Sequence, residues 1–207
     1  MGITLTNYWA TTHPSEPNYC AAAGGDNFGM DNDDFHSIPE DISTVVDLLD
    51  TKGISWAEYQ EDIPYPGFQG FNFSNQKTFA NDYVRKHDPL ILYQSVTKNA
   101  TRLSLIKGFT SLESDVVNQR LPQWAFITPN MTNDGHDVSS APYMLAFPSL
   151  PWLPERLGQS METVRGTAAD SPHPDQCYFC LCMGTQPDRS RPERSLRLQQ
   201  HFGSPHF

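Results

Sequence analysis

A single serine lies in a stretch whose residue types and spacing favour nucleophilic chemistry. An apolar run at residues 3–10 leads into a proline-punctuated loop that contains Ser15, and small residues then continue to two glycines. This order predicts a strand, a tight turn and the first turn of a helix. The hydroxyl of Ser15 would lie beside unpaired backbone N–H groups, where a phosphate can also bind. Ser15 is therefore a candidate nucleophile, although the local sequence alone favours the commoner role of a helix cap, with Pro17 in the first turn.

A basic pair, Lys86 and His87, ends a later loop and precedes a buried apolar run at residues 90–93. An ammonium group and an imidazole are donors suited to the oxygens of a phosphate. The alternative is a solvent-exposed basic pair without a ligand, which the local sequence supports equally well.

A cluster of polar side chains follows a second buried-strand pattern, at residues 124–129. The side chains that come directly after it are Asn133, Asp134, His136 and Asp137. Ligands of open α/β sheets bind outside the carboxyl ends of strands, so this loop is well placed to contact a metal or a phosphate. The same composition also fits a plain Asn/Asp/Gly turn. Because the loops of Ser15 and His136 both follow strands, we expect them to meet at one edge of the sheet.

Two further segments contain metal-ligand residue types at weaker spacing. The acidic loop at residues 26–36 alternates Asp and Asn but lacks the Gly and closing Glu positions of an EF-hand, which favours a solvated turn. Cys177, Cys180 and Cys182 cluster late in the chain, with His173 as a candidate fourth ligand. Such a cluster can bind zinc, although no second ligand pair stands at a finger-like distance.

The elements that must position these residues follow from hydrophobic periodicity. A helix starting at residues 41–43 ends at Gly53, and an alternating strand follows at residues 54–59. A second helix is predicted at residues 112–121 with Ser111 as its N-cap, before the strand at 124–129. Residues 61–79 read as an irregular segment that covers a site. Helix, glycine and strand in this order predict an α/β fold with a largely parallel sheet.

The composition excludes several classes of partner. With 207 residues and a net charge of −10, the chain suits one domain with or without a tail, and its acidity argues against nucleic acid and anionic membranes. No apolar run approaches the ~20 residues of a transmembrane helix, and the first residues lack a signal-peptide pattern. Sequons at Asn72, Asn99 and Asn130 indicate instead a glycoprotein of a secreted lineage. None of these features sets the oligomeric state.

Four separated motifs, in this order, resemble fungal acid phosphatases of the phosphoesterase family, which also includes bacterial phospholipases C. The motifs lie at residues 12–19, 29–36, 85–89 and 128–137, and the resemblance spans residues 3–137. It implies an α/β fold, a partial alkaline-phosphatase-like and largely parallel sheet flanked by helices. It also implies hydrolysis of a small phosphorylated substrate, without choosing between phosphomonoesters and phospholipids.

The resemblance also implies roles for individual residues. The serine or threonine of the family's Pro-Ser/Thr-x-Pro-Asn motif is the nucleophile, and Ser15 occupies that position. The implied reaction is attack of Ser15 on phosphorus, a phosphoseryl intermediate and its hydrolysis by water. The residues implied to bind substrate are His13, Asn18, Lys86, His87 and Asn133. His136 would protonate the departing alkoxide or act as a site ligand, and Asp134 and Asp137 are candidate ligands of a divalent metal ion of unknown identity.

Other parts of the family pattern are not found in this sequence. The Glu-Asn metal motif expected ahead of the Ser15 region and the acidic motif expected after the His136 loop are both missing. We therefore expect a fragment: a truncated phosphoesterase domain at 1–137, joined to a poorly ordered Pro/Arg/Ser-rich tail at 138–207. The alternatives are a catalytically inactive remnant and a zinc-binding module in the tail. Family members are expected to be secreted, in the cell wall or vacuolar, whereas this chain shows no signal peptide.

Overall fold

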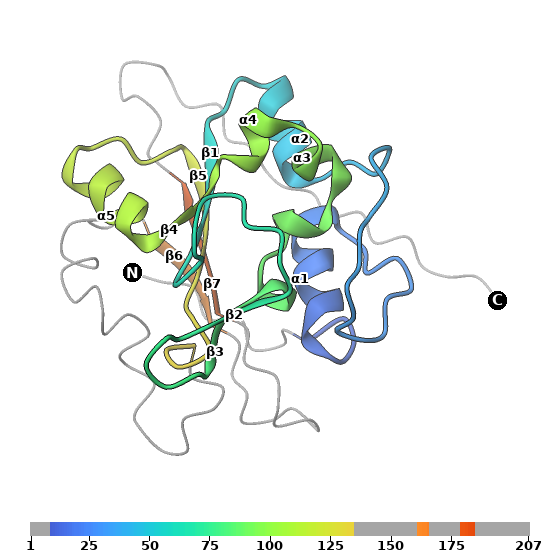
Figure 1. The fold of residues 1–207 in the computed structure, drawn as a ribbon. Helices are drawn as coiled ribbons and strands as arrows, with labels where there is room; N and C mark the ends of the chain where they lie inside the picture. The colour runs from blue at the N-terminus through green and yellow to red at the C-terminus, as the bar shows by residue number, and fades with distance from the viewer. Residues whose placement is uncertain (1–8, 135–160, 166–178, 185–207) are drawn as a thin grey trace.

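A five-stranded sheet forms the centre of the protein. The computed structural model describes residues 9–134 together with the backbone of two later strands, residues 161–165 and 179–184. The strand order is β4-β1-β5-β7-β6 (Figure 1). The strands are β1 (Trp56–Gln60), β4 (Ile106–Gly108), β5 (Trp124–Thr128), β6 (Met161–Arg165) and β7 (Phe179–Gly184). β1 pairs in parallel with β4 and β5, whereas β7 is antiparallel to β5 and β6 is antiparallel to β7.

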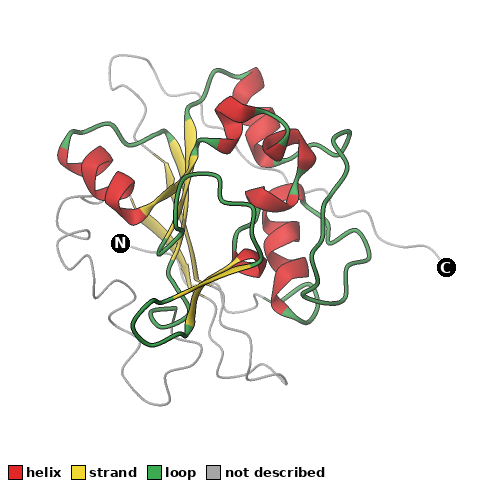
Figure 2. Ribbon diagram, viewed as in Figure 1, coloured by secondary structure: helices red, strands yellow, loops and turns green. Residues whose placement is uncertain are grey.

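Helices cover both faces of this sheet (Figure 2). One face carries α5 (Phe109–Val117), and the other carries the remaining helices. These are α1 (Ser15–Gly24), α2 (Val45–Thr51), α3 (Gln94–Thr97) and α4 (Ala100–Leu103), with the short 3-10 helices η1 (Arg85–His87) and η2 (Leu90–Leu92). The predicted α/β class, with a parallel β4-β1-β5 core flanked by helices, is confirmed.

The central strand β1 is buried along its whole length, as expected for a strand covered on both faces. Its side chains alternate between two apolar clusters. Ala57 and Tyr59 pack with α5 through Leu112, whereas Trp56 packs with α1, α2 and η2. Glu58 therefore faces the same side of the sheet as α1, where a buried carboxylate needs polar partners.

The helix boundaries differ from the sequence prediction at the starts of α2 and α5 and at the end of α5, which is Val117 and not residue 121. α2 begins at Val45, not at residues 41–43, because Thr44 and Asp47 form a capping box at that position. α5 begins at Phe109 with Gly108 as its N-cap, so Ser111 lies inside the helix and its predicted capping role is wrong. The strands predicted at 54–59 and 124–129 are confirmed as β1 and β5.

The segment expected to be irregular, residues 61–79, contributes a strand to a small hairpin. β2 (Asn72–Ser74) pairs antiparallel with β3 (Asn81–Val84), separately from the main sheet. β3 leads directly into η1, so this hairpin positions the basic pair that was predicted to contact phosphate.

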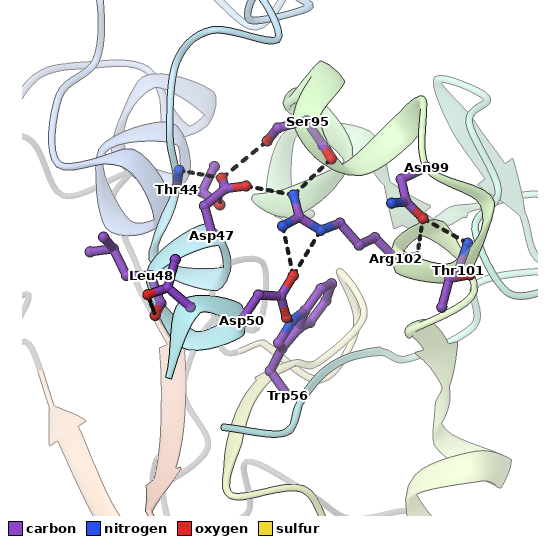
Figure 3. A network of polar contacts seen from close by, with 10 residues as sticks. Thr44, Asp47, Leu48, Asp50, Trp56, Ser95, Asn99, Thr101 and Arg102 are labelled. Atoms are coloured by element: carbon purple, nitrogen blue, oxygen red, sulfur yellow. Dashed lines mark hydrogen bonds and ion pairs between the residues drawn. The ribbon is translucent and has the colours of Figure 1, made fainter. Parts of the chain in front are cut away.

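One arginine joins the helices on the α1 side (Figure 3). Arg102 of α4 donates from Nε to Asp50 Oδ2 at 2.9 Å and pairs with Asp47, both on α2. Its guanidinium also donates to the backbone carbonyl of Ser95 in α3 at 3.0 Å. Trp56 Nε1 donates to the other oxygen of Asp50 at 2.9 Å, which connects the network to β1.

Several predicted features fall outside the described residues. The apolar run predicted as a strand lies mostly there, since the description begins at Trp9, and Trp9 and Ala10 are not in a strand. The predicted tail contributes β6 and β7, and its remaining residues are not described. The side chains of the zinc candidates Cys177, Cys180 and Cys182 are likewise outside the description. Within the described part, no helix is both long and apolar enough to cross a membrane.

Candidate active site

Ser15 is the first residue of α1, and it lies half-buried at the helix N-terminus. The N-cap is Pro14, preceded by a cis His13–Pro14 peptide bond, so the alternative of Ser15 as the cap is wrong. Within the described residues, no side chain forms a hydrogen bond with the Ser15 hydroxyl. The serine is therefore available at a helix end where backbone N–H groups favour an anion.

Asn18 holds the loop that presents Ser15. Its Oδ1 accepts from the backbone N–H groups of Thr11 and Thr12, at 2.8 and 3.1 Å. Its Nδ2 donates to the carbonyls of Thr12 and Pro14, at 2.8 and 2.7 Å. All these partners are backbone atoms, so the observed role of Asn18, which was predicted to contact substrate, is to fix the turn before Ser15. His13 is exposed in the same turn.

Asp33 connects the N-terminus of α1 with the predicted basic pair. Its Oδ1 accepts from the backbone N–H of Glu16 at 2.8 Å, and its Oδ2 pairs with Lys86 Nζ at 3.1 Å. Glu16 directly follows Ser15, so the ammonium of Lys86 lies close to the candidate nucleophile. The prediction that Lys86 contacts phosphate stays a prediction.

His87, in the motif at residues 85–89, contacts α1. Its ring stacks on Tyr19, with centroids 4.8 Å apart, and its Nδ1 lies 3.9 Å from Asp134 Oδ2. Tyr19 stands four residues after Ser15 on α1, which places both side chains on one face of the helix. His87 thus connects Tyr19 of α1 with Asp134 in the loop after β5, whereas His136, named in the prediction that the two loops meet, lies outside the described residues.

The loop after β5 is fixed by carboxylates that the sequence analysis did not single out. Glu61 accepts from Asn133 Nδ2 at 2.9 Å and from the backbone N–H of Asn130 at 3.0 Å. Asp82 accepts from Thr132 Oγ1 at 3.3 Å, and its backbone carbonyl accepts from the N–H of Met131. Glu61 directly follows β1, so the strand-end argument used for Asn133 would also have found it. Asn133 itself stays a predicted substrate contact.

A buried acidic pair lies behind η1. Glu58 and Asp88 have no exposed surface. Glu58 accepts from Gln60 Nε2 and the N–H of Leu90, and Asp88 accepts from Tyr83 OH at 2.9 Å. Burial, then the neighbouring charge of Asp88, raises the pKa of Glu58 well above its ordinary value. Burial also raises the pKa of Asp88 to about 6, against the hydrogen bond from Tyr83 that lowers it.

Glu16 is another fully buried carboxyl, and it directly follows Ser15. Neither of its oxygens has a hydrogen-bond partner among the described residues. Burial raises its pKa to about 7; the Arg85 guanidinium opposes this, and the negative charge of Asp33 adds to it. The backbone N–H of His36 also lowers the pKa of Glu16. The hydrogen bond of this N–H goes to the carbonyl oxygen of Asp34. Glu16 thus prefers its neutral form in acid.

The predicted metal site is not assembled by the described residues. No group of three or more His, Cys, Asp or Glu side chains among them has an arrangement that could hold a metal ion. Asp134 is described and lies against His87, whereas Asp137 and His136 are outside the described residues. The described residues alone do not fit a metal, and no reaction step is derived through one.

Comparison with known proteins identifies the family. Residues 1–144, more than two thirds of the chain, match the Phosphoesterase family. The chain belongs to the Phosphoesterase family. This confirms the resemblance inferred from the four motifs, one of which includes Ser15.

The chain is similar to curated proteins named acid phosphatases from fungi. It is 72% identical to an acid phosphatase of Aspergillus fumigatus over 139 residues, and this matched region covers 67% of this chain and 31% of the relative. It is 68% identical, over 67% of this chain and 33% of the relative, to a probable acid phosphatase of Kluyveromyces lactis. A phosphatidylinositol-3-phosphatase of Mycobacterium tuberculosis is 31% identical, over 68% of this chain and 43% of the relative. The chain thus spans about a third of the fungal relatives' length, and no solved structure matches it significantly.

Proposed function

We propose that this member of the Phosphoesterase family hydrolyses phosphate monoesters, like the fungal acid phosphatases to which it is similar, with Ser15 as the nucleophile. The observation that carries the proposal is the convergence of three separated motifs on α1. Lys86 reaches the first turn of the helix through Asp33, and His87 and Asp134 reach its next turn through Tyr19. Charged and polar donors beside a hydroxyl at a helix N-terminus form an arrangement suited to phosphoryl transfer.

The proposed reaction has two steps. Ser15 Oγ attacks phosphorus, the bond from phosphorus to the leaving oxygen breaks, and the proton of the serine hydroxyl ends on the departing alcohol. Water then attacks the phosphoseryl group, releasing inorganic phosphate and restoring the serine hydroxyl. The Lys86 ammonium and the positive end of the α1 dipole would stabilise the charge on the phosphoryl oxygens. His136 is the candidate acid for the leaving oxygen.

The cofactor proposed for this family member is a divalent metal ion, whose charge would offset that of the phosphoryl oxygens. Asp134 and Asp137 are the candidate ligands in this chain. Their role is tested by titrating metal into the purified protein and into its Asp134→Asn variant.

The test is release of nitrophenol from nitrophenyl phosphate at mildly acidic pH. Ser15→Ala is expected to abolish turnover, while the matched variant Ser43→Ala, at an exposed serine outside α1, should retain it. Turnover by Ser15→Ala equal to that of the wild type would refute the nucleophile. Cooperative unfolding without any turnover in the wild type would favour the catalytically inactive remnant. Phosphatidylinositol 3-phosphate as a second substrate tests the activity named for the mycobacterial relative.

A further inference from the structure

Asp33 makes two contacts that together define a position for the Lys86 ammonium. Its Oδ1 accepts from Glu16 N at 2.8 Å, and its Oδ2 lies 3.1 Å from Lys86 Nζ. Asp33 comes from the loop between α1 and α2, and Lys86 from η1 after β3. The two side chains are only 25% and 30% exposed, so solvent screens this pair less than a surface pair.

A lysine needs such a contact to act at a fixed point. Its four-carbon stem has many rotamers, and ordering it costs conformational entropy. Among the described residues, Asp33 is the acidic partner of Lys86, since no other ion pair of this lysine occurs there. The ammonium has three donors and Asp33 takes one, so two remain for another anion.

The contact of Asp33 with the Glu16 backbone N–H fixes the position of the Asp33 carboxylate. Glu16 N belongs to the first turn of α1, and its position is set by the helix and by the turn that Asn18 holds. Because one carboxylate spans both groups, the ammonium cannot move far from the residue that precedes Glu16, which is Ser15.

We propose that Asp33 is a positioning residue, which holds the Lys86 ammonium beside Ser15 so that it meets the phosphoryl group of the substrate. The inference rests on the proposed function of the Ser15 site and adds the residue that orders its cation. The competing role is purely structural: Asp33 would accept from Glu16 N–H and stabilise the start of α1, with Lys86 incidental.

A double-mutant cycle separates the two roles, because contacting residues show coupling that independent residues lack. Asp33→Asn keeps an oxygen for Glu16 N–H but removes the charge that holds Lys86. It is measured alone and in a Lys86→Met background, by the KM and kcat for nitrophenyl phosphate and by inhibition with inorganic phosphate. We expect Asp33→Asn to raise KM and the phosphate inhibition constant about tenfold, with a smaller change in kcat, and to have no further effect when Lys86 is Met.

The matched control is Asp34→Asn, which removes the same charge from the next residue, an exposed one. It should leave KM within about twofold of the wild type. If Asp33→Asn fails to fold, Asp33→Glu replaces it, because the longer side chain keeps the charge but displaces it by one methylene. It should raise KM only when Lys86 is present.

Three results would overturn the inference. Equal effects of Asp33→Asn with and without Lys86 would assign Asp33 to the helix start alone. Unchanged KM and phosphate inhibition in Asp33→Asn, with an active wild type, would refute the positioning role and leave the proposed function intact. A folded wild type that neither hydrolyses nitrophenyl phosphate nor binds inorganic phosphate would refute the proposed function, and the positioning role with it.

Discussion

The carboxyl next to Ser15 should make the protein more stable in acid than at neutral pH. Glu16 has no exposed surface, and burial raises its pKa from 4.5 to about 7. The folded state therefore holds a proton that the unfolded chain has already lost in this pH window, so the free energy of unfolding falls as pH rises. A shift of this size corresponds to about 3 kcal/mol, lost progressively between pH values of about 4.5 and 7.

Glu16→Gln isolates this contribution, because glutamine has a similar shape and does not ionise. At a pH of about 4 the variant and the wild type should unfold with similar free energies. Near pH 8 the variant should be more stable by about 3 kcal/mol, since only the wild type then buries a charge. Glu58 and Asp88 act in the same direction in both proteins, so their contributions cancel in the comparison.

The assay is urea unfolding followed by tryptophan fluorescence at several pH values, with the midpoint and slope fitted separately. Glu40→Gln, at an exposed carboxylate paired with Lys98, is the matched control and should leave the pH dependence unchanged. Parallel stability curves for the wild type and Glu16→Gln between pH values of about 4.5 and 7 would refute the reasoning.

Three further predictions concern the frame around the site. Arg102→Ala should lower the free energy of unfolding by about 2 kcal/mol, because it leaves Asp47 and Asp50 without their shared cation. The control Lys98→Ala, which breaks an exposed ion pair, should lower it by less than about 0.5 kcal/mol in the same urea assay. Gly24→Ala should cost about 1–3 kcal/mol, since its Cβ would meet the hydroxyl of fully buried Tyr93; an unchanged thermal midpoint would contradict this. In a glycosylating host, mass spectrometry should find glycan at the exposed Asn72 and Asn99 but not at Asn130. Asn130 is buried and donates from Nδ2 to Asp62, so glycan at Asn130 would contradict the prediction.

Hydrophobic periodicity and helix-stop signals in the sequence predicted two of the sheet strands and the end of one helix. β1 was found from its alternating pattern and β5 from a short apolar run, and the end of α2 was found because Gly53 stands just past the helix, at a φ of 64°. The start of α2 was placed too early because residues 41–43 resemble a cap, whereas the capping box with Asp47 begins at Thr44. The hairpin of β2 and β3 was missed because its strands have three and four residues.

The site was predicted less completely, for a physical reason. Residue types and family order pointed to Ser15, Lys86 and His87, but contacts between distant segments leave no local pattern. Asp33 lies 53 residues from the lysine that it pairs with, so only the folded chain shows the bridge. Asn18 lies in the motif that resembles the family's, but its side-chain amide donates to backbone carbonyls of its own loop.

The central claim is that Ser15 carries the phosphoryl group during turnover. The most direct measurement is acid quenching of the protein during hydrolysis of nitrophenyl phosphate, followed by mass spectrometry of the peptide that contains Ser15. We predict a phosphoryl group on Ser15 that appears with substrate and disappears when substrate is exhausted. Turnover with Ser15 unmodified at every time point, and equal turnover by Ser15→Ala, would contradict the claim.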